Sequence, residues 1–504
     1  MSSSDTQPSS YPALDSQQLL YIGGKYQSSS DNGTFDVTNP MTGQKIYDCA
    51  SATVDDYSRA IDIAHEAFKT WSKVGPSARR LIFLKAADIL ETYLTLDAPT
   101  LMSNEVSATA AWVKVNLVST ANVLRDVASL ATLIKGELIP ADRPGTTILV
   151  ERQPVGVNLA ISPWNAPVNL TARAVACPLL CGNTVVLKPS EFSPKSQHLV
   201  VRAFTEAGLP EGCLNFLPSS PAQTPAVTEY AVKHPLMQRV NFTGSDRVGR
   251  MIAGWAATVL KKCVLELGGK APVIVLEDAN IEDAVEAVVF GAMSNAGQIC
   301  MSTERVLVHR SIMGTFKSKL LERIAMLRTG NNMEDPSVSI SGLFTPASAA
   351  RVMDYLKTAV DSGAKVVTGD MAVSGPNKTI ISPHVLENVT PEMDIFQKES
   401  FGPVLCLFEF DTDEEAIESA NNTDFSLCAS VFSKDIMRAL DVARRVRAGS
   451  CHVNGPTVYI EPTLPNGGVG GSSGYGRFGG MAGVEEFTER RMISLAPSGQ
   501  RYHF

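Results

Sequence analysis

The chain has 504 residues, of which 44% are hydrophobic and 19% are charged, and its formal net charge is −8. Such a chain is long enough for several domains, or for one large α/β assembly around a buried core. Its mild acidity argues against a nucleic-acid partner, which would need a basic stripe. No run of about 18 apolar residues is present, so we expect no membrane-spanning helix.

Residues 1–18 are rich in serine and glutamine and contain neither the basic nor the apolar segment of a signal peptide. We expect a disordered tail there and a cytoplasmic protein. Nine cysteines are scattered without a CxxC pair or a Cys/His cluster, so we predict neither a metal site nor a disulfide framework. Cys177 and Cys181 are expected to be buried thiols on one helix face.

The first third of the chain is predicted to be mostly helical. Apolar residues recur at helical spacing over Val54–Leu96 and again over Ala121–Ile134. A turn-rich connector, Lys135–Gly145, then leads to a strand with a charged end, Thr146–Arg152. A strand that projects between turns in this way is a candidate arm for assembly.

From Gly156 onwards, short apolar runs alternate with helical segments, which predicts a parallel sheet with helices on both faces. The predicted strands are Gly156–Ile161, Thr184–Leu187, Cys213–Leu217 and Arg239–Phe242, and the predicted helices are Ala166–Leu180, Lys195–Ala207 and Arg247–Ala257. A second series begins near Ala271, with a strand, a helix over Ile281–Ala296 and a strand over Arg305–Val308. We expect a long irregular connection in Ser382–Leu407 and a glycine-rich loop in Pro465–Gly483.

Cys300 follows an apolar helix in the glycine-containing turn Gly297-Gln298-Ile299-Cys300. A thiol held beside helix ends can have a lowered pKa and act as a nucleophile. One cysteine among nine is by itself more often a buried structural thiol. The interpretation of Cys300 therefore depends on its context.

That context begins with Glu266, which ends an apolar strand and is followed by Leu267, two glycines and Lys270. Ligands bind at such strand ends in open α/β sheets. Desolvation would raise the pKa of Glu266 toward neutrality, which suits a general base. A structural ion pair between Glu266 and Lys270 is the alternative.

Asn165 stands directly after a predicted strand, in Pro163-Trp164-Asn165-Ala166-Pro167. An amide at a strand end can donate a hydrogen bond to a developing oxyanion. An ordinary helix cap is the alternative.

Two further segments are interpreted as nucleotide contacts. Val185–Glu191 ends a strand with Lys188 and Glu191, which can hold ribose or phosphate; a solvated surface pair is the alternative. Phe242–Gly249 is a strand–turn–helix junction, where free backbone N–H groups favour a pyrophosphate. An ordinary helix cap by Ser245 is the alternative there.

Taken together, these segments resemble the aldehyde dehydrogenase superfamily from about Leu19 to Leu495. The matching motifs are SPWNAP, KPSE, FTGS, LELGGK and GQIC, together with KESFGP at Lys398–Pro403 and GGVGGSSGYGRFGG at Gly467–Gly480. The 34-residue separation between Glu266 and Cys300 also fits the family. Each motif alone is modest, but jointly they are highly specific.

The resemblance implies a catalytic role for three residues. Cys300 would be the nucleophile, Glu266 the base that activates the deacylating water, and Asn165, with the backbone N–H of Cys300, the oxyanion hole. The thiolate would add to an aldehyde, hydride would pass to the nicotinamide, and hydrolysis of the thioester would release a carboxylic acid. A CoA-acylating enzyme is disfavoured because Glu266 supplies a hydrolytic base.

The resemblance also implies a nicotinamide cofactor and its contacts. Lys188 and Glu191 would hold the adenosine ribose, Ser245 the pyrophosphate and Glu399 the nicotinamide ribose, while Trp164 and Phe401 would line the cleft. The other implied contacts are Ile161, Gly244, Gly249 and Leu267. Glu191 favours NAD, because a carboxylate there would repel a 2′-phosphate. NADP is the alternative, since the Glu191 side chain can swing away.

The implied fold is α/β, with a Rossmann-like cofactor domain, an α/β catalytic domain and a β oligomerisation arm that builds a homodimer or homotetramer. The cofactor domain would span 19–134 and 153–266, the catalytic domain 267–465, and the arm 135–152 and 484–504. A catalytically silent protein on this scaffold would be expected to lose the cysteine or the glutamate, and this chain keeps both.

Longer stretches resemble the narrower branch of salicylaldehyde and vanillin dehydrogenases, among them KGELIPADRPG and GQICMSTER. This resemblance implies an aromatic aldehyde substrate. The alternatives are an aliphatic aldehyde or semialdehyde, or a bulkier polyketide-derived aldehyde.

Three segments depart from that branch. Val106-Ser107 stands where a Thr-Gly pair is usual, Asn466 stands where a Phe is usual, and Met293–Ala296 lacks the usual aromatic residue. We expect these positions to lie around the substrate entrance.

Four residues are candidate substrate contacts. Asn169 and Arg173 lie one turn apart on the predicted helix that begins beside Asn165. Arg173 would meet a phenol oxygen or a carboxylate, with a surface or inter-helix salt bridge as the alternative. Trp112 and Tyr459 would supply aromatic walls, with ordinary core packing as the alternative.

Overall fold

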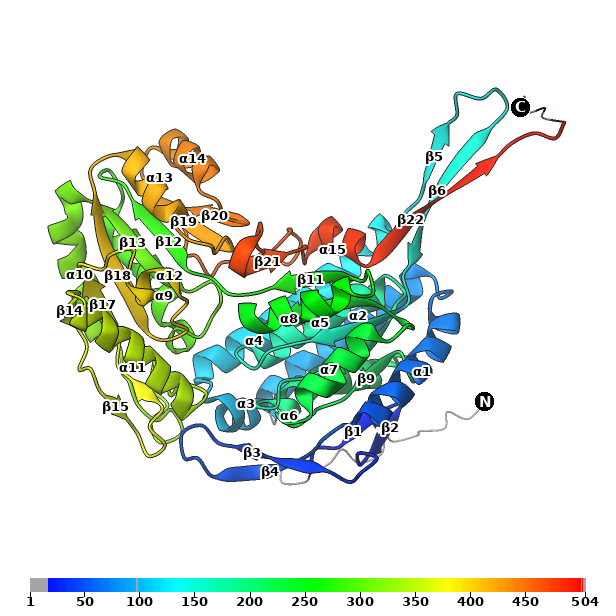
Figure 1. The fold of residues 1–504 in the computed structure, drawn as a ribbon, viewed down its shortest axis with the longest axis horizontal. Helices are drawn as coiled ribbons and strands as arrows, with labels where there is room; N and C mark the ends of the chain where they lie inside the picture. Colours follow the sequence, from blue (N-terminus) through cyan, green and yellow to red (C-terminus); the bar gives the residue numbers. More distant parts are fainter. Residues whose placement is uncertain (1–16, 97, 500, 502–504) are drawn as a thin grey trace.

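The computed structural model describes residues 17–96, 98–499 and 501. Most of the predicted tail, residues 1–16, lies outside these ranges; within them, Gln18 forms a parallel bridge with Cys49. Two α/β units lie side by side, and a narrow three-stranded sheet projects from one of them (Figure 1).

An eight-stranded sheet forms the core of the first unit. In sheet order its strands are β2 (Lys25–Gln27), β1 (Leu20–Ile22), β9 (Leu214–Phe216), β8 (Thr184–Lys188), β7 (Val157–Ile161), β10 (Met237–Thr243), β11 (Lys262–Glu266) and β21 (Gly474–Tyr475). The five strands from β9 to β11 are parallel, and the edge strands are antiparallel. β7, β8 and β9 are buried along their whole length, as expected for a sheet covered on both faces.

Two apolar clusters pack on the two faces of this sheet. One cluster includes residues of α2 (Pro76–Thr92), α3 (Ala98–Val106), α4 (Ala110–Ser129), α5 (Pro167–Leu180), α6 (Pro194–Ala207) and α15 (Gly480–Glu486). The other includes α1 (Val54–Trp71), α7 (Thr224–Lys233) and α8 (Asp246–Ala257). On the first face, α4 lies on the side toward the second unit (Figure 1).

A seven-stranded sheet forms the core of the second unit. Its order is β14 (Lys365–Thr368), β17 (His384–Glu387), β18 (Val404–Phe410), β13 (Thr303–His309), β12 (Ala271–Val275), β19 (Cys428–Phe432) and β20 (Ser450–Val453), all parallel except β14. One face packs on α9 (Ile281–Met293), α10 (Met313–Ala325), α11 (Pro346–Asp361) and α12 (Asp394–Gln397). The other packs on α13 (Asp413–Asn421) and α14 (Ile436–Arg445).

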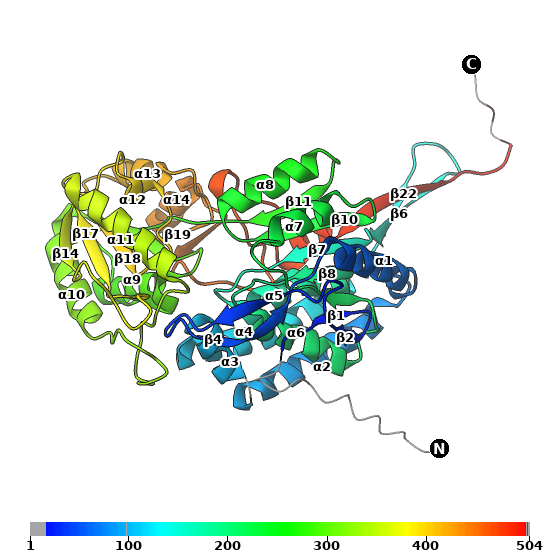
Figure 2. The ribbon, with the colours of Figure 1, turned by 60° about the horizontal axis from the view of Figure 1, so that its bottom comes forward.

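The projecting arm is an antiparallel sheet of β5 (Glu137–Pro140), β6 (Thr147–Pro154) and β22 (Thr488–Leu495). It stands clear of both units (Figure 1 and Figure 2) and exposes Leu138, Met492 and Leu495. Its role in assembly, like the division into domains, stays a prediction.

Short elements complete the described fold. Two small hairpins pair β3 (Thr34–Thr38) with β4 (Lys45–Ala50) and β15 (Val373–Ser374) with β16 (Ile380–Ile381). The 3-10 turns are η1 (Tyr93–Thr95), η2 (Leu130–Leu133), η3 (Ser294–Gly297), η4 (Arg310–Ile312) and η5 (Gly471–Ser473). None of the helices that the structure describes is long and apolar enough to cross a membrane.

Three sequence predictions need correction. The helix predicted at Ala121–Ile134 starts earlier, at Ala110, where Thr109 caps it. The segment Ser382–Leu407 is not one irregular connection, because its short apolar runs form β17, α12 and the start of β18. The helix predicted to reach Ala296 ends at Met293, since Asn295 and Ala296 adopt left-handed backbone angles.

Candidate active site

The candidate site lies where the chain crosses from one sheet to the other. Glu266 is the last residue of β11 in the first sheet, and β12 of the second sheet begins only five positions later at Ala271. Cys300 stands just before β13, the strand that pairs with β12. A Cβ on Gly269 would overlap the carbonyl oxygen of Cys300, so the crossing segment and the cysteine loop are in direct contact.

The backbone before Cys300 is unusual. Asn295, Ala296 and Gly297 have φ angles of 50°, 55° and 72°. A left-handed conformation costs a non-glycine residue about 1–2 kcal/mol. Hydrogen bonds hold this turn: the Asn295 amide donates to the carbonyl of Asn165 at 3.1 Å, and the Asn295 carbonyl accepts from the backbone N–H of Gln298 at 3.1 Å. The turn brings Cys300 back toward the first unit.

The Cys300 thiol is partly buried and lies 3.3 Å from Oε1 of Glu266. Burial raises the pKa of Cys300 to about 12, and the nearby Arg173 guanidinium opposes this rise. The lowered pKa predicted from the sequence is therefore wrong, because desolvation outweighs the positive charge of Arg173. A base beside the sulfur is needed to form the thiolate at neutral pH.

Glu266 is 1% exposed and forms an ion pair with Arg173 of α5. Thr243, at the end of β10, also donates to Oε2 of Glu266 at 3.3 Å. The alternative pairing with Lys270 is wrong, since Lys270 forms a buried ion pair with Glu304. The raised pKa predicted for Glu266 stays a prediction.

Asn165 is buried beside the cysteine loop. Its Nδ2 donates to the carbonyl of Gln298 at 2.9 Å, and its own carbonyl accepts from Nε1 of Trp112 at 2.8 Å. The helix-cap alternative is not found, because the N-cap of α5 is Ala166 and no side chain caps that helix. These contacts hold the Asn165 amide close to the backbone that leads into Cys300.

Two cavities of about 600 and 620 Å³ meet at this point. Asn165, Leu170 and Cys300 line both of them. The cysteine is therefore reachable from two sides, which suits a reaction between two different ligands.

The larger cavity contains most of the predicted cofactor residues. Those lining it are Trp164, Gly244, Ser245, Leu267, Glu399 and Phe401. Glu399 accepts a hydrogen bond from the backbone N–H of Gly269 at 2.8 Å. Burial, reinforced by Glu304, raises the pKa of Glu399 to about 8.

Four predicted cofactor residues lie outside that lining. Lys188 is buried at the end of β8, and its Nζ donates a hydrogen bond to the carbonyl of Pro189. The alternative of a solvated surface pair with Glu191 is therefore wrong. Ile161 pairs with Lys188 across the sheet. Gly249 packs against Leu267, where a Cβ would overlap the Leu267 side chain. Glu191 is half-buried.

Sequence reasoning missed the aromatic wall of this cavity. Phe344 stacks on Trp164 with ring centroids 3.7 Å apart, and Phe401 meets the edge of Trp164 at 5.9 Å. Phe344 lies in the loop before α11, and no local motif marks it. A glycine-lined entrance, an aromatic wall and a buried carboxyl fit the planar ring and ribose hydroxyls of a nicotinamide nucleotide.

The smaller cavity contains three of the four predicted substrate residues: Trp112, Asn169 and Arg173. Tyr459 does not line it, although its neighbours Val458 and Ile460 do. The Tyr459 ring is half-exposed and packs against His452 at 5.6 Å. The chain turns just before Tyr459, whose N–H donates to the carbonyl of Pro456 at 3.3 Å.

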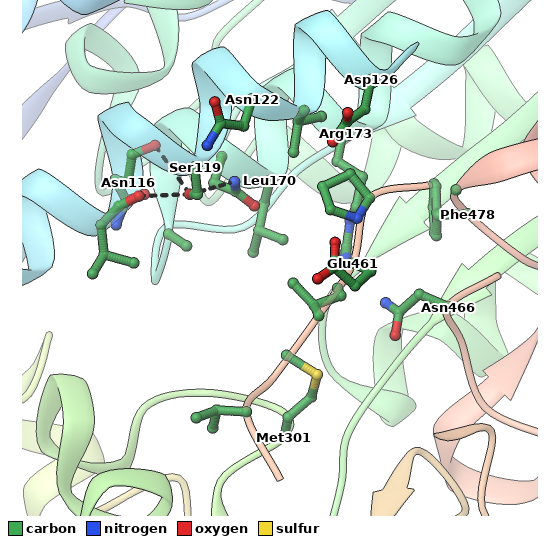
Figure 3. A pocket seen from close by; sticks show the side chains of 18 of the residues that line it. Asn116, Ser119, Asn122, Asp126, Leu170, Arg173, Met301, Glu461, Asn466 and Phe478 are labelled. Atoms are coloured by element: carbon green, nitrogen blue, oxygen red, sulfur yellow. Dashed lines mark hydrogen bonds between the residues drawn. The ribbon is translucent and has the colours of Figure 1, made fainter. Parts of the chain in front are cut away.

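Other lining residues were not predicted as contacts. They include Asn116, Ser119 and Asp126 of α4, and Glu461, Asn466 and Phe478 of the segment between β20 and α15 (Figure 3). Of the three segments that depart from the aromatic branch, the Asn466 position and Ser294 of Met293–Ala296 line the cavity. Val106 and Ser107 do not; they are buried at the end of α3, so their expected place at the entrance is wrong.

The comparisons with known proteins agree on one family. A sequence model described as "Aldehyde dehydrogenase family" matches residues 26–493. Vanillin dehydrogenase of Pseudomonas sp. (strain HR199 / DSM 7063) is 43% identical, over 96% of this chain and 98% of its own length. Salicylaldehyde dehydrogenase of Pseudomonas putida is 44% identical, over 96% and 99%.

The solved structures give the same result. The crystal structure of a salicylaldehyde dehydrogenase from Pseudomonas putida G7 complexed with salicylaldehyde matches with a TM-score of 0.94 and 43% identity, covering 97% of this chain and 100% of that one. A structure of an NAD-dependent aldehyde dehydrogenase from Sinorhizobium meliloti matches with a TM-score of 0.93 at 31% identity, over 99% and 98%.

Proposed function

The chain belongs to the aldehyde dehydrogenase family, and from this premise we propose that it oxidises an aromatic aldehyde to the carboxylic acid through a thioester on Cys300. One observation carries the proposal. Cys300 lies where two cavities meet, with Glu266 against its sulfur and Asn165 beside it. The chain is a nicotinamide-dependent oxidoreductase, as its relatives are.

The first step assigned to these residues is formation and attack of the thiolate. Glu266 takes the thiol proton across the 3.3 Å contact, and the Arg173 cation stabilises the sulfur anion that results. The aldehyde lies in the smaller cavity, and the thiolate adds to its carbonyl carbon. Nδ2 of Asn165 and the backbone N–H of Cys300 donate to the oxygen as it becomes negative.

The larger cavity serves the oxidation. Bound there, the nicotinamide cofactor supplies the hydride acceptor. Glu399 would hold the nicotinamide ribose, Ser245 the pyrophosphate, and Trp164 and Phe401 the ring. We also propose NAD rather than NADP, because Glu191, on the loop after β8, would repel a 2′-phosphate.

Deacylation completes the turnover. Glu266 first releases the thiol proton to solvent and is again a carboxylate. It then accepts a proton from a water molecule, the hydroxide adds to the thioester carbon, and the C–S bond breaks to give the acid and the Cys300 thiolate. A buried carboxylate within reach of the sulfur favours water over a thiol such as CoA as the acyl acceptor. The product is then the free acid.

The smaller cavity supports an aromatic substrate. Trp112 and Phe478 offer flat walls, and the relatives include vanillin, salicylaldehyde and benzaldehyde dehydrogenases. The lining also contains the carboxylates Asp126 and Glu461. Its two arginines are already paired, Arg173 with Glu266 and Arg125 with Asp88 and Glu91. A substrate with its own carboxylate is disfavoured there, which argues against a semialdehyde acid.

The assembly and the compartment are further parts of the proposal. The exposed apolar residues of β5 and β22 support a homodimer or homotetramer built through the arm.

The nine cysteines are all free in the described residues, which fits the reducing conditions of the cytoplasm.

An aldehyde panel tests the substrate. Benzaldehyde, salicylaldehyde and vanillin are compared with hexanal and succinic semialdehyde, each with NAD and with NADP, by absorbance of the reduced cofactor. We expect the highest kcat/KM for an aromatic aldehyde with NAD, and the lowest for succinic semialdehyde. A clear preference for hexanal or for the semialdehyde would overturn the aromatic assignment, and strict dependence on CoA would overturn hydrolysis.

A further inference from the structure

Asn466 holds a defined place in the wall of the smaller cavity. Its backbone is fixed by two hydrogen bonds with Phe478: the Asn466 N–H donates at 2.8 Å and the Asn466 carbonyl accepts at 2.9 Å. The side chain is only 7% exposed, and Figure 3 shows its amide turned into the cavity.

The amide nitrogen of Asn466 is a buried donor in need of an acceptor. Nδ2 has no hydrogen-bond partner among the residues that the structure describes. A buried amide donor without a partner is costly, and natural proteins rarely keep one without a reason. Two other lining residues have an unpaired buried atom, Arg173 and Asn116. Arg173 is already held by its ion pair, and the unpaired atom of Asn116 is an acceptor.

We propose that Asn466 selects aldehydes whose aromatic ring carries an oxygen substituent, a methoxy or hydroxy group, by donating a hydrogen bond from Nδ2 to that oxygen. This inference rests on the proposed function, because it specifies the ring that the smaller cavity accepts. When an unsubstituted ring fills the cavity and expels water, the Nδ2 donor stays unpaired. An oxygen on the ring removes that penalty, so the amide discriminates between the two rings.

The test compares ratios of kcat/KM within each variant. The substrates are benzaldehyde and its 2-, 3- and 4-methoxy derivatives, whose oxygen can only accept a hydrogen bond. The ratio of a methoxy substrate to benzaldehyde does not depend on the fraction of folded enzyme. Electronic effects of the substituent are also shared by all variants, so they cancel in the comparison.

Two substitutions separate the donor from the shape of the side chain. Asn466→Leu removes the polar group, and Asn466→Asp keeps the shape but replaces the donor with an acceptor. For at least one methoxy isomer we expect both variants to lower the ratio by about tenfold, the worth of one hydrogen bond in a closed site. For the hydroxy derivative of the same isomer, Asn466→Asp should keep the ratio within about threefold, because a phenol can donate to the carboxylate.

The outcomes separate this inference from the proposed function. If the wild-type enzyme oxidises the aromatic series and neither variant changes any methoxy ratio, the role of Asn466 is refuted and the aromatic assignment stands. If the wild type oxidises aliphatic aldehydes in preference to the whole aromatic series, the proposed function fails first. A selective loss for a methoxy isomer in both variants supports both.

Discussion

The two cavities that meet at Cys300 differ in where their residues come from. The larger one includes residues that follow the carboxyl ends of three neighbouring strands, Trp164 after β7, Ser245 after β10 and Leu267 after β11. The smaller one is lined by the faces of α4 and α5 and by the loop after β20. The strand ends of a parallel sheet lie along one edge of that sheet, so the positions of the residues that follow them are fixed by the fold. A residue on a helix face or in a loop can be substituted without moving its neighbours. The cavity on the cofactor side is therefore more constrained by the fold than the smaller cavity.

The largest expected effect is at the residue that both cavities share. Cys300→Ala removes the nucleophile, so turnover should fall by a factor of about 10⁴ or more. Cofactor binding, measured by fluorescence titration, should stay within about twofold, since the larger cavity keeps its other walls. Residual turnover near the wild-type rate would mean that another group attacks the aldehyde.

Glu266→Gln should give the next largest loss, because water activation is removed while the nucleophile remains. We expect steady-state turnover to fall by about 10²–10³-fold. Rapid mixing should still show a burst of about one reduced cofactor per active site, slower than in the wild type, with the acyl group retained on Cys300. A variant that turns over at the wild-type rate would refute the assignment of Glu266.

Arg173 tests the electrostatics of the smaller cavity. Its cation lowers the pKa of Cys300, which burial places at about 12. In the wild type, iodoacetamide labelling of Cys300, followed by mass spectrometry of its peptide, should rise with pH from 7 to 10 without a plateau. Arg173→Met raises that pKa further, so labelling at a given pH should slow by about 10-fold or more. Arg173→Lys keeps the charge and should restore most of the rate; equal effects of Met and Lys would contradict this explanation.

A substitution of Glu399 tests the larger cavity without changing the smaller one. Glu399→Gln should raise the KM for the cofactor by about 5–10-fold and leave the KM for the aldehyde unchanged. Because the pKa of Glu399 is about 8, its carboxylate form increases from pH 7 to 9, and ionised carboxylates accept hydroxyl hydrogen bonds more strongly. Cofactor affinity of the wild type should rise over that range, and the variant should show no such rise. A change in aldehyde KM would break the separation of the two cavities.

The smallest effect is expected on the aromatic wall of the smaller cavity. Trp112→Phe keeps a ring but loses the hydrogen bond to the carbonyl of Asn165, which is worth about 1 kcal/mol. The KM for the aldehyde should rise by about 2–5-fold, with the cofactor KM unchanged. Steady-state kinetics are measured with the aldehyde and the cofactor varied in turn. A rise in the aldehyde KM alone distinguishes a local effect on the smaller cavity from a general loss of stability.

Secondary-structure elements and local motifs could be predicted from the sequence better than the partners of individual side chains. Strands such as Val157–Ile161 and the helix Pro167–Leu180 followed from apolar periodicity, which is local. The partner of Glu266 was not local: Lys270 is four residues away in the chain, but Arg173 reaches the carboxylate from α5 across the sheet. The left-handed Ala296 has no sequence signal, because alanine is an ordinary helix residue.

The substrate wall was the least predictable region. Asn169 and Arg173 were found because the helix that begins beside Asn165 must face the site. Trp112 and Tyr459 were both proposed as aromatic walls, and only Trp112 lines the cavity. Glu461 in this wall, like Phe344 in the larger cavity, lies in a loop whose path no periodicity describes. Such residues can be located only once the loops are placed against the helices.

The crossing segment between the two sheets has a mechanical consequence. Glu266 belongs to the eight-stranded sheet and Cys300 to the loop that enters the seven-stranded one, so their 3.3 Å contact joins the two units. The distance that the thiol proton crosses is therefore set by how the two sheets are held against each other, and a substitution that shifts one sheet relative to the other would change that distance.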